Sequence, residues 1–481
     1  QLQLEVVKRH ATGTPTLVVG CDARYGSSEF ATAACRVASA AGVRVLALPQ
    51  ANPTPLTSFS MLHFDADAGV MVTASHNPAP DNGYKVYLGG SVVQGDGRGV
   101  QIVPPFDAEI AAAIEAAPPA DEVPMNDDLI EAVDPREEYV ACASALASGD
   151  ASARENLRIV LTAMHGVGAA ITSRVLAEAG FTNVSLVATQ ADPDPDFPTV
   201  PFPNPEEAGA LDMAIEQARE QGADLIIAVD PDADRCALAV PDPASQTGWS
   251  PLSGDQIGSL IGEFLASRGL PGSLANSIVS SRLLSRIARA HGLEHHTTLT
   301  GFKWIARAPG LGFGYEEAIG FCPDPAHVRD KDGIATSVVA ASLVASLKTQ
   351  GRSVWDELER LARLHGLHVS SPLTFRVDDI EQIASGMARL RAQPPSVLAG
   401  SPVVEVSDLA QGYRGLPPTD GVLVLTEAED RVIARPSGTE PKLKCYLEVI
   451  LPVVDGEPLP WGQARERLEA IKAAFAEIIG L

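Results

Sequence analysis

The chain has few basic residues for its size and no long apolar run. Its 36 Lys and Arg residues are outnumbered by 61 Asp and Glu residues, which gives a net charge of −25 at pH 7. An acidic surface repels nucleic-acid backbones and anionic membranes, so neither is expected as a primary partner. No stretch reaches the roughly 18 consecutive apolar residues typical of a membrane span, so no such span is expected either.

The six cysteines are widely spaced, and no CxxC motif occurs. We therefore expect reduced, partly buried thiols rather than disulfides or a metal site, and a cytoplasmic location. The chain opens QLQLEVVKRH, with neither an initiator Met nor a signal peptide, and we expect it to be an N-terminally shortened form. The cysteines are Cys21, Cys35, Cys142, Cys236, Cys322 and Cys445.

A length of 481 residues predicts about three or four domains, and a hydrophobic content of 45% is enough to form a core in each. Apolar β-branched runs alternate with amphipathic stretches in three successive rounds, which indicates three related α/β domains with largely parallel sheets. After His365 the pattern changes to strands followed by a closing helix, which indicates an α+β domain. Shifts in composition predict the domain boundaries 1–150, 151–252, 253–366 and 367–481.

The expected elements follow from this patterning. In the α/β part we expect strands at Leu17–Gly20, Val43–Leu48, Gly69–Thr73, Arg158–Thr162, Val184–Val187, Leu225–Val229, Ser277–Ser280 and Glu294–Leu299, with helices at Ser28–Ala41, Ala169–Ala179, Glu206–Gln221, Gly254–Ser267 and Leu283–His291. In the α+β part we expect strands at Leu373–Val377, Val403–Val406, Val422–Leu425, Arg431–Pro436 and Leu443–Leu451, and a helix at Ala464–Ile479.

The first loop with chemical character is TASHNP, directly after an apolar strand. A serine at the carboxyl end of a strand, here Ser75 beside His76, is suited to act as a nucleophile. The following DNGYK brings Lys85 close in sequence. An ordinary polar turn is the alternative interpretation, because Ser, Asn and Pro are turn residues.

The second loop, DPDADR, follows another buried strand and holds three carboxylates at alternating positions. Hard oxygen ligands in such an array suit Mg²⁺, which pairs with phosphate. Asp230, Asp232 and Asp234 are therefore candidate metal ligands. A solvated acidic turn and an aspartyl phosphatase are the alternatives.

The third loop, GYEEAIG, carries the adjacent carboxylates of Glu316 and Glu317, which can accept hydrogen bonds from sugar hydroxyls. A charged turn, RDKDG, lies nearby and contains Lys331. A plain loop is the alternative interpretation.

The fourth loop, RPSGTEPK, combines Arg435 with two hydroxyls, a glycine and a lysine. A guanidinium fork and exposed backbone N–H groups suit phosphate recognition, while a surface hairpin is the alternative. Together the four loops indicate phosphoryl transfer on a polyol phosphate.

These four motifs, in this order, resemble the α-D-phosphohexomutase superfamily of phosphoglucomutases and phosphomannomutases, in the branch with EEAIG in its sugar loop. The resemblance implies a heart-shaped protein of four domains, three related α/β mixed-sheet domains and a C-terminal α+β domain similar to TATA-binding protein. Each domain would contribute one loop to a common cleft. The family's early Gly/Arg-rich segment is not found, which fits a shortened first domain.

The resemblance also assigns roles to residues. Ser75 would be the phosphoserine, and Mg²⁺ would be held by Ser75, Asp230, Asp232 and Asp234. The groups around the reacting phosphoryl would be Arg24, His76, Lys85 and Lys331. The substrate-binding residues would be Arg235, Lys303, Glu316, Glu317, Arg435, Ser437, Gly438, Thr439 and Lys444.

The implied activity is that of a phospho-sugar mutase, an isomerase that interconverts glucose or mannose 1- and 6-phosphates through a sugar bisphosphate. We expect Lys85 or Lys331 as general base, with a pKa lowered by cationic neighbours, and His76 as the alternative. Ala318 occupies the position where the family often has serine. A phosphopentomutase is therefore an alternative function. A sugar-1,6-bisphosphate synthase and an inactive sugar-phosphate sensor are further alternatives. A phosphorylated sugar is the expected partner, and the chain would be a monomer or homodimer.

Overall fold

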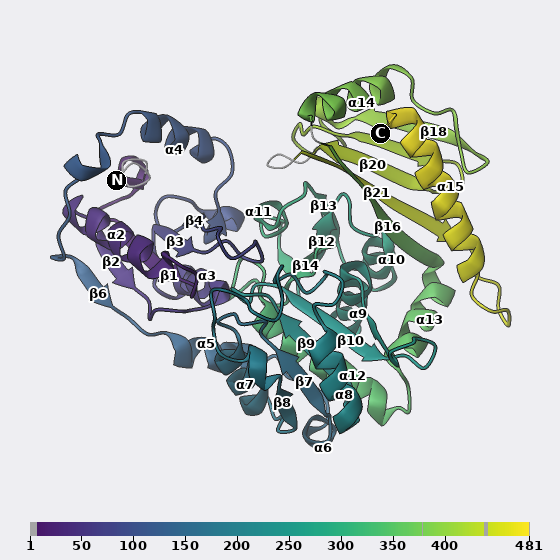
Figure 1. Cartoon of the computed structure of the whole chain (residues 1–481), viewed down its shortest axis with the longest axis horizontal. Helices are drawn as coiled ribbons and strands as arrows, with labels where there is room; N and C mark the ends of the chain where they lie inside the picture. The colour runs from purple at the N-terminus through teal and green to yellow at the C-terminus, as the bar shows by residue number, and fades with distance from the viewer. Residues whose placement is uncertain (1–6, 378, 437–440, 481) are drawn as a thin grey trace. The chain divides into compact units, whose positions relative to one another are not determined.

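The computed structural model describes residues 7–377, 379–436 and 441–480. The chain forms two compact units (Figure 1). The first unit comprises Gln1–Ala275 and Gly301–Val354, and the second comprises Asn276–Thr300 and Trp355–Leu481. The second unit is therefore assembled from two separate stretches of sequence.

The first unit begins with a six-stranded mixed sheet of order β5-β4-β3-β1-β2-β6. Alternate side chains of β1 point to opposite faces, so Leu17 packs toward Ala38 of α2, while Val18 packs toward Met61 of α3. Strands β1, β2, β3 and β6 pair in parallel, and β4 and β5 are antiparallel additions. The elements are β1 (Thr16–Cys21), α2 (Ser27–Ala40), β2 (Arg44–Ala47), α3 (Thr54–His63), β3 (Ala68–Val72), β4 (Tyr84–Leu88), β5 (Val100–Gln101) and β6 (Ile130–Ala132).

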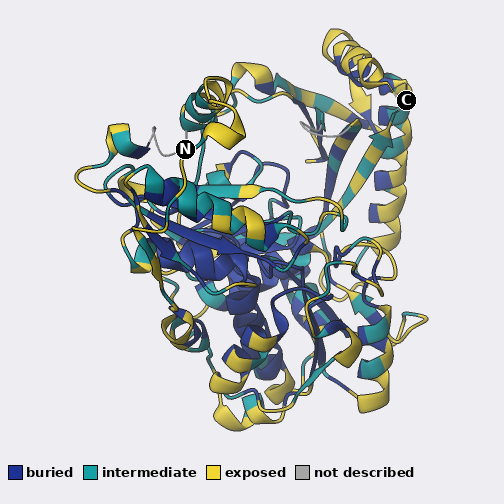
Figure 2. Cartoon of the chain, turned by 60° about the vertical axis from the view of Figure 1, so that its left-hand side comes forward, coloured by how far each residue is buried: buried dark blue, intermediate teal, exposed yellow. Residues whose placement is uncertain are grey.

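A second sheet has the order β11-β10-β9-β7-β8, with β7, β8 and β9 parallel and β10 and β11 antiparallel. A hairpin of β14 and β15 and the long buried helix α12 follow in the same unit. Burial is concentrated on the strands, while most of the helices other than α3, α9 and α12 expose their outer faces (Figure 2). The elements are β7 (Ile159–Thr162), α7 (Ala169–Glu178), β8 (Val184–Leu186), α8 (Asp212–Gln221), β9 (Leu225–Val229), β10 (Cys236–Pro241), β11 (Trp249–Pro251), α9 (Gly254–Ala266), α11 (Phe302–Ile305), β14 (Leu311–Glu316), β15 (Gly320–Cys322) and α12 (Gly333–Thr349).

The second unit is built on an antiparallel sheet of order β16-β21-β20-β19-β18-β17. Helices α14 and α15 pack on one face (Figure 1), and Ile278 and Val279 join the apolar cluster on the other. Arg431 fixes that segment by donating to the carbonyl oxygens of Ile278 at 2.9 Å and Ser280 at 2.7 Å. The elements are β16 (Leu367–Arg376), α14 (Ile380–Ala392), β17 (Val397–Leu398), β18 (Ser401–Asp408), β19 (Val422–Thr426), β20 (Arg431–Pro436), β21 (Lys442–Leu451) and α15 (Trp461–Ile479).

The remaining helices and strands complete the two units. No helix in the described ranges combines the length and apolar character needed to cross a membrane. All six cysteines are free thiols, and five of them are buried. These elements are η1 (Gly95–Gly97), α4 (Phe106–Glu115), η2 (Ala120–Glu122), α5 (Arg136–Ser144), α6 (Ala151–Glu155), η3 (Ala188–Gln190), β12 (Ser273–Ser277), α10 (Leu283–Ala290), β13 (His295–Thr298), α13 (Val354–His365) and η4 (Leu409–Gln411).

Three expectations about local structure were wrong. The strand expected at Ser277–Ser280 lies at Ser273–Ser277, because the hydroxyls of Ser277 and Ser280, 2.8 Å apart, close a turn there. The helix expected from Glu206 begins only at Asp212, because Asn204 accepts the Glu206 amide at 3.1 Å and holds a turn. The α/β sheets are mixed, as the family resemblance implied, rather than largely parallel as periodicity alone indicated, since antiparallel strands extend one edge of the first two.

Candidate active site

Ser75 lies just beyond the carboxyl end of β3 in a strained loop. Its φ of 51° is in the left-handed region, which non-glycine residues seldom adopt outside functional or tightly constrained sites. Thr73 Oγ1 accepts a hydrogen bond from the Ser75 amide at 2.9 Å and stabilises this conformation. The Ser75 hydroxyl donates to Asp230 Oδ2 at 3.1 Å and lies 3.2 Å from His76 Nδ1. The candidate nucleophile therefore contacts the acidic loop directly.

Arg24 holds the backbone of this loop. Its guanidinium is buried and lies 5.0 Å from the centre of the Phe197 ring. The donors of one side chain thus fix several peptide groups of the loop at once, which a lysine cannot do. The four carbonyl oxygens that accept from it are those of Ser75 (2.7 Å), Asn77 (2.6 Å), Pro78 (2.9 Å) and Asp81 (3.2 Å).

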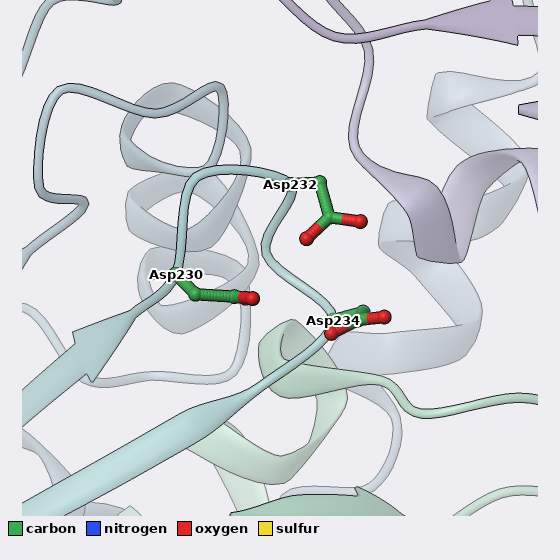
Figure 3. Close-up of side chains that lie close together, drawn as sticks. All are labelled: Asp230, Asp232 and Asp234. Atoms are coloured by element: carbon green, nitrogen blue, oxygen red, sulfur yellow. The ribbon is translucent and has the colours of Figure 1, made fainter. Parts of the chain in front are cut away.

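Three aspartates lie on the turn that joins β9 to β10 (Figure 3). Asp230, Asp232 and Asp234 are fully buried, and one oxygen from each lies within 4.8 Å of the others. Within the described part of the chain, Oδ1 of Asp232 and Oδ1 of Asp234 have no hydrogen-bond partner. Buried carboxylate oxygens without donors are costly unless a cation is bound. The residues present therefore fit a hard divalent cation such as Mg²⁺.

The pKa values of these carboxyls are shifted in opposite directions. Burial raises the pKa of Asp230 well above its usual range, and the other two carboxylates of the loop add to that effect. Burial acts the same way on Asp234, but the charges of Lys331, Lys85 and Arg235 outweigh it and lower its pKa. The acidic turn is thus surrounded by cationic side chains.

Lys85 and Lys331 approach the same carboxylate from different segments. Lys85 Nζ donates to Asp232 Oδ2 at 2.6 Å and also to Asp234 Oδ2, while Lys331 Nζ lies 3.0 Å from Asp234 Oδ2. Burial alone would lower the pKa of Lys85, but the charges of Asp232 and Asp234 raise it instead. The same balance raises the pKa of Lys331. The two lysine pKa values are thus raised rather than lowered as expected, because carboxylates face both ammonium groups.

His76 is neutral at pH 7. Burial, assisted by the charge of Arg235, lowers its pKa to about 3. The ring contacts Phe202 edge-on, with centroids 6.2 Å apart. Phe202 was not predicted as a site residue. Glu206 was not predicted either, although its charge is among those that raise the pKa of Arg235. The Pro-rich segment PFPNPEE indicates turns, and nothing in its pattern indicates contact with His76.

The EEAIG segment forms the tight loop of the β14–β15 hairpin. Glu316 pairs with Gly320, and Ile319 has a φ of 52°. Arg235 donates to the Ala318 carbonyl at 3.2 Å, so this loop is attached to the acidic loop. Glu316 and Glu317 are half-buried here, and their role as hydroxyl acceptors stays a prediction.

Lys303 lies in α11, directly after Phe302. The Phe302 ring centre is 5.8 Å from Lys331 Nζ. Most of the predicted site residues of the first unit lie in contact with one another. Lys303 is next in sequence to Phe302, whose ring lies near Lys331. The residues brought into direct contact are Arg24, Ser75, His76, Lys85, Asp230, Asp232, Asp234, Arg235 and Lys331.

The predicted phosphate loop belongs to the second unit. Arg435 of β20 is directly opposite Lys444 of β21, so both side chains emerge from the same face of the sheet. Ser437, Gly438 and Thr439, which complete the prediction, lie outside the described residues.

The sequence matches three profiles of one family. Residues 1–120, 137–244 and 253–364 match "Phosphoglucomutase/phosphomannomutase, alpha/beta/alpha" domains I, II and III. Together these segments cover more than half of the chain.

Curated relatives and solved structures agree with these profiles. The chain is 44% identical over 442 residues to a "Probable phosphomannomutase" of Haemophilus influenzae, which covers 90% of this chain and 88% of that protein. It is 34% identical over 466 residues to a "Phosphoglucomutase" of Staphylococcus haemolyticus, which covers 90% and 83%. The crystal structure of a putative phosphomannomutase from Thermus thermophilus superposes with a TM-score of 0.72 at 25% identity, covering 98% of this chain and 93% of that one.

Proposed function

This chain belongs to the phosphoglucomutase/phosphomannomutase family and is a phospho-sugar mutase, and from that premise we propose that it interconverts the 1- and 6-phosphates of glucose or mannose through phosphorylated Ser75. The observation that carries the residue assignment is the 3.1 Å contact between Ser75 Oγ and Asp230 Oδ2. In this contact the Ser75 hydroxyl lies against one carboxylate of the triad, where a phosphoryl group and a cation would meet.

In the first transfer, the bond between phosphorus and Ser75 Oγ breaks while a bond forms between phosphorus and the free hydroxyl oxygen of the sugar phosphate. That hydroxyl loses its proton and Ser75 Oγ gains one, so the product is a sugar bisphosphate and a free serine. In the second transfer, Ser75 Oγ takes the other phosphoryl group and the sugar oxygen regains a proton. The bisphosphate is thus the intermediate, and added bisphosphate acts as an activator by phosphorylating Ser75.

The residues suited to hold Mg²⁺ are Asp230, Asp232 and Asp234, together with a phosphate oxygen on Ser75. A bound Mg²⁺ would neutralise charge on the transferring phosphoryl group and offset the carboxylate charge that faces the two lysines.

Lys85 and Lys331 are the groups that we propose for moving the substrate proton. Both contact Asp234, from β4 and from the RDKDG loop respectively. Because they approach from different segments, one can serve each half-reaction without moving far. His76 lies 3.2 Å from Ser75 Oγ and can exchange a proton with it as the serine is phosphorylated and dephosphorylated.

The sugar and the second phosphate would be bound by the other loops. Glu316 and Glu317 accept hydrogen bonds from sugar hydroxyls, with Arg235 and Lys303 nearby. Arg435, Lys444 and the loop at 437–439 hold the phosphate that is not transferred. The proposed location is the cytoplasm, in keeping with six free thiols, and the proposed assembly is a monomer or homodimer.

The test is a coupled assay of the purified chain with glucose 1-phosphate and mannose 1-phosphate, each with catalytic bisphosphate and Mg²⁺. We expect formation of the 6-phosphate, labelling of Ser75 by radioactive bisphosphate, and loss of both in Ser75→Ala. Full activity of Ser75→Ala would refute the phosphoserine. Ribose 1-phosphate in parallel would reveal a pentose preference.

A further inference from the structure

Two buried aspartates flank Lys331, and each accepts a hydrogen bond from a different tyrosine earlier in the chain. Tyr87 donates its hydroxyl to Asp330 Oδ2 at 2.6 Å. Tyr139 donates to Asp332 Oδ1 at 2.8 Å. Asp330 and Asp332 are 1% and 2% exposed, so neither carboxylate is a surface charge. The RDKDG loop is therefore attached to two separate elements of the first unit.

The Asp330 carboxylate has donors on both oxygens. Oδ2 also accepts from Gln101 Nε2 at 2.7 Å, and Oδ1 accepts the backbone amide of Lys331 at 2.8 Å. Burial raises the pKa of Tyr87 well above its usual value, so its hydroxyl remains a donor. Three donors fix the orientation of this carboxylate and, through its Oδ1, the backbone of Lys331.

One strand connects the two lysines. Lys85 and Tyr87 are two positions apart on β4 and therefore point to the same face. Pairing with β3 fixes their register, with Met71 opposite Lys85 and Gly69 opposite Tyr87. From this strand Lys85 reaches Asp234 while Tyr87 reaches Asp330, which lies next to Lys331.

We propose that Asp330 is a positioning residue for phosphoryl transfer: anchored by Tyr87 and Gln101, it holds Lys331 against Asp234 in a fixed relation to Lys85. This inference rests on the proposed function, in which these lysines move the substrate proton. The role follows from geometry, since misplacing a reacting group by about 1 Å can cost about 100-fold in rate. Substrate affinity depends on other loops, so the effect belongs in kcat rather than KM.

Asp332 offers a matched comparison. Its Oδ1 accepts the Tyr139 hydroxyl and also the Ala335 amide at 2.8 Å, so it caps α12. Replacing Tyr139 by Phe removes the same chemical group, a buried phenol bonded to an aspartate of the same loop. The lost hydrogen bond then affects a helix cap rather than the carboxylate that is bonded to the Lys331 amide.

The experiment compares Tyr87→Phe, Asp330→Asn and Tyr139→Phe in the full chain. Steady-state kcat and KM are measured with the sugar phosphate that the wild type converts, and Tm is measured for each variant. We expect kcat to fall about tenfold in Tyr87→Phe and about 100-fold in Asp330→Asn, with KM within about twofold. Tyr139→Phe should lower Tm about as much as Tyr87→Phe while keeping kcat within about twofold.

Several results would overturn the inference. They are an unchanged kcat in Asp330→Asn, an equal loss of kcat in Tyr139→Phe, or an effect confined to KM. If Asp330→Asn does not fold, the double variant Tyr87→Phe/Gln101→Met decides by the same criteria. A wild type without turnover refutes the proposed function and this inference together, whereas an active wild type with an equally active Asp330→Asn refutes only the inference.

Discussion

The hydroxyl of Tyr139 donates a 2.8 Å hydrogen bond to Asp332, an aspartate that caps α12 and is 2% exposed. Chiefly through burial, the pKa of this carboxyl is raised to about 7. In the unfolded chain the Asp332 carboxyl has its ordinary, lower pKa. Between about pH 4 and pH 7 the native state therefore binds more protons than the unfolded state. Stability therefore falls as pH rises from about 4 to about 7, and the loss is nearly complete about one pH unit above that.

We predict that Asp332→Asn weakens this pH dependence. The amide oxygen of Asn can still accept from Tyr139 and from the Ala335 amide, but it carries no charge. Between pH 6 and pH 8 the wild type should lose about 1 kcal/mol more stability than the variant. Urea unfolding at both pH values measures this, and an equal change in the two proteins would contradict it.

Gly320 gives room to the Lys331 side chain. A Cβ at this position would lie 2.3 Å from Lys331 Cδ and 3.0 Å from Glu316 Oε1. We predict that Gly320→Ala displaces Lys331 and lowers kcat by about tenfold or more. Gly462→Ala in α15 is the control, because its Cβ would meet nothing within 4 Å, and its kcat should stay at the wild-type value. Unchanged kcat in Gly320→Ala would show that Lys331 tolerates the shift.

Arg24 supports the Ser75 loop through a planar fork that lysine lacks. We predict that Arg24→Lys lowers the rate of phosphoryl transfer by about tenfold or more, because most of the four carbonyl contacts are lost. Arg36→Lys is the control, since Arg36 forms an exposed ion pair with Asp127 of little energetic weight. Initial rates measure both, and limited proteolysis of the loop reports its mobility. Similar rates in the two variants would refute the specific role of Arg24.

Metal binding should stabilise the acidic turn. We predict that millimolar MgCl₂ raises Tm of the wild type relative to NaCl of equal ionic strength, because a ligand of the native state alone shifts the folding equilibrium. Asp232→Asn should abolish the shift, while Asp212→Asn, at the exposed start of α8, should keep it. A shift that survives in Asp232→Asn would place the cation elsewhere.

Glu448 of β21 is the centre of a buried charge cluster in the second unit. It accepts from Arg282 Nε at 2.6 Å and Ser281 Oγ at 2.7 Å, and it lies 3.4 Å from Arg431. We predict that Glu448→Gln costs about 3–5 kcal/mol, because buried cations lose their counter-charge. Glu469→Gln, in an exposed pair with Lys472, should cost less than about 1 kcal/mol. Denaturant unfolding separates the two, and equal costs would refute the prediction.

Much of the fold was predictable because strand and helix periodicity is local. The four-motif resemblance to the phosphohexomutase superfamily is confirmed by the family profiles and by a 44% identical relative, and the mixed α/β class is confirmed as well. The domain boundaries and individual site roles stay predictions. The contact between Ser75 and Asp230 could be anticipated, because both follow the carboxyl ends of buried strands.

Other features were not predicted, for physical reasons. Helix α3 (Thr54–His63) is buried over most of its surface, so it shows no amphipathic period. Helix α14 was missed although Ile383, Met387 and Leu390 follow helical spacing. The contact of Tyr87 with Asp330 joins residues 243 positions apart. No local pattern encodes such a contact, because it depends on how complete elements pack.

The segment Asn276–Thr300 is part of the unit that contains the C-terminal sheet, and Arg431 bonds to its backbone carbonyls. A fragment that starts at residue 367 would therefore lack the apolar side chains of Ile278 and Val279 that cover one face of its sheet. It would also leave the Arg431 guanidinium without these acceptors. The C-terminal sheet is thus a poor candidate for exchange between relatives as one contiguous cassette: a swap that preserves its packing must carry both stretches of sequence.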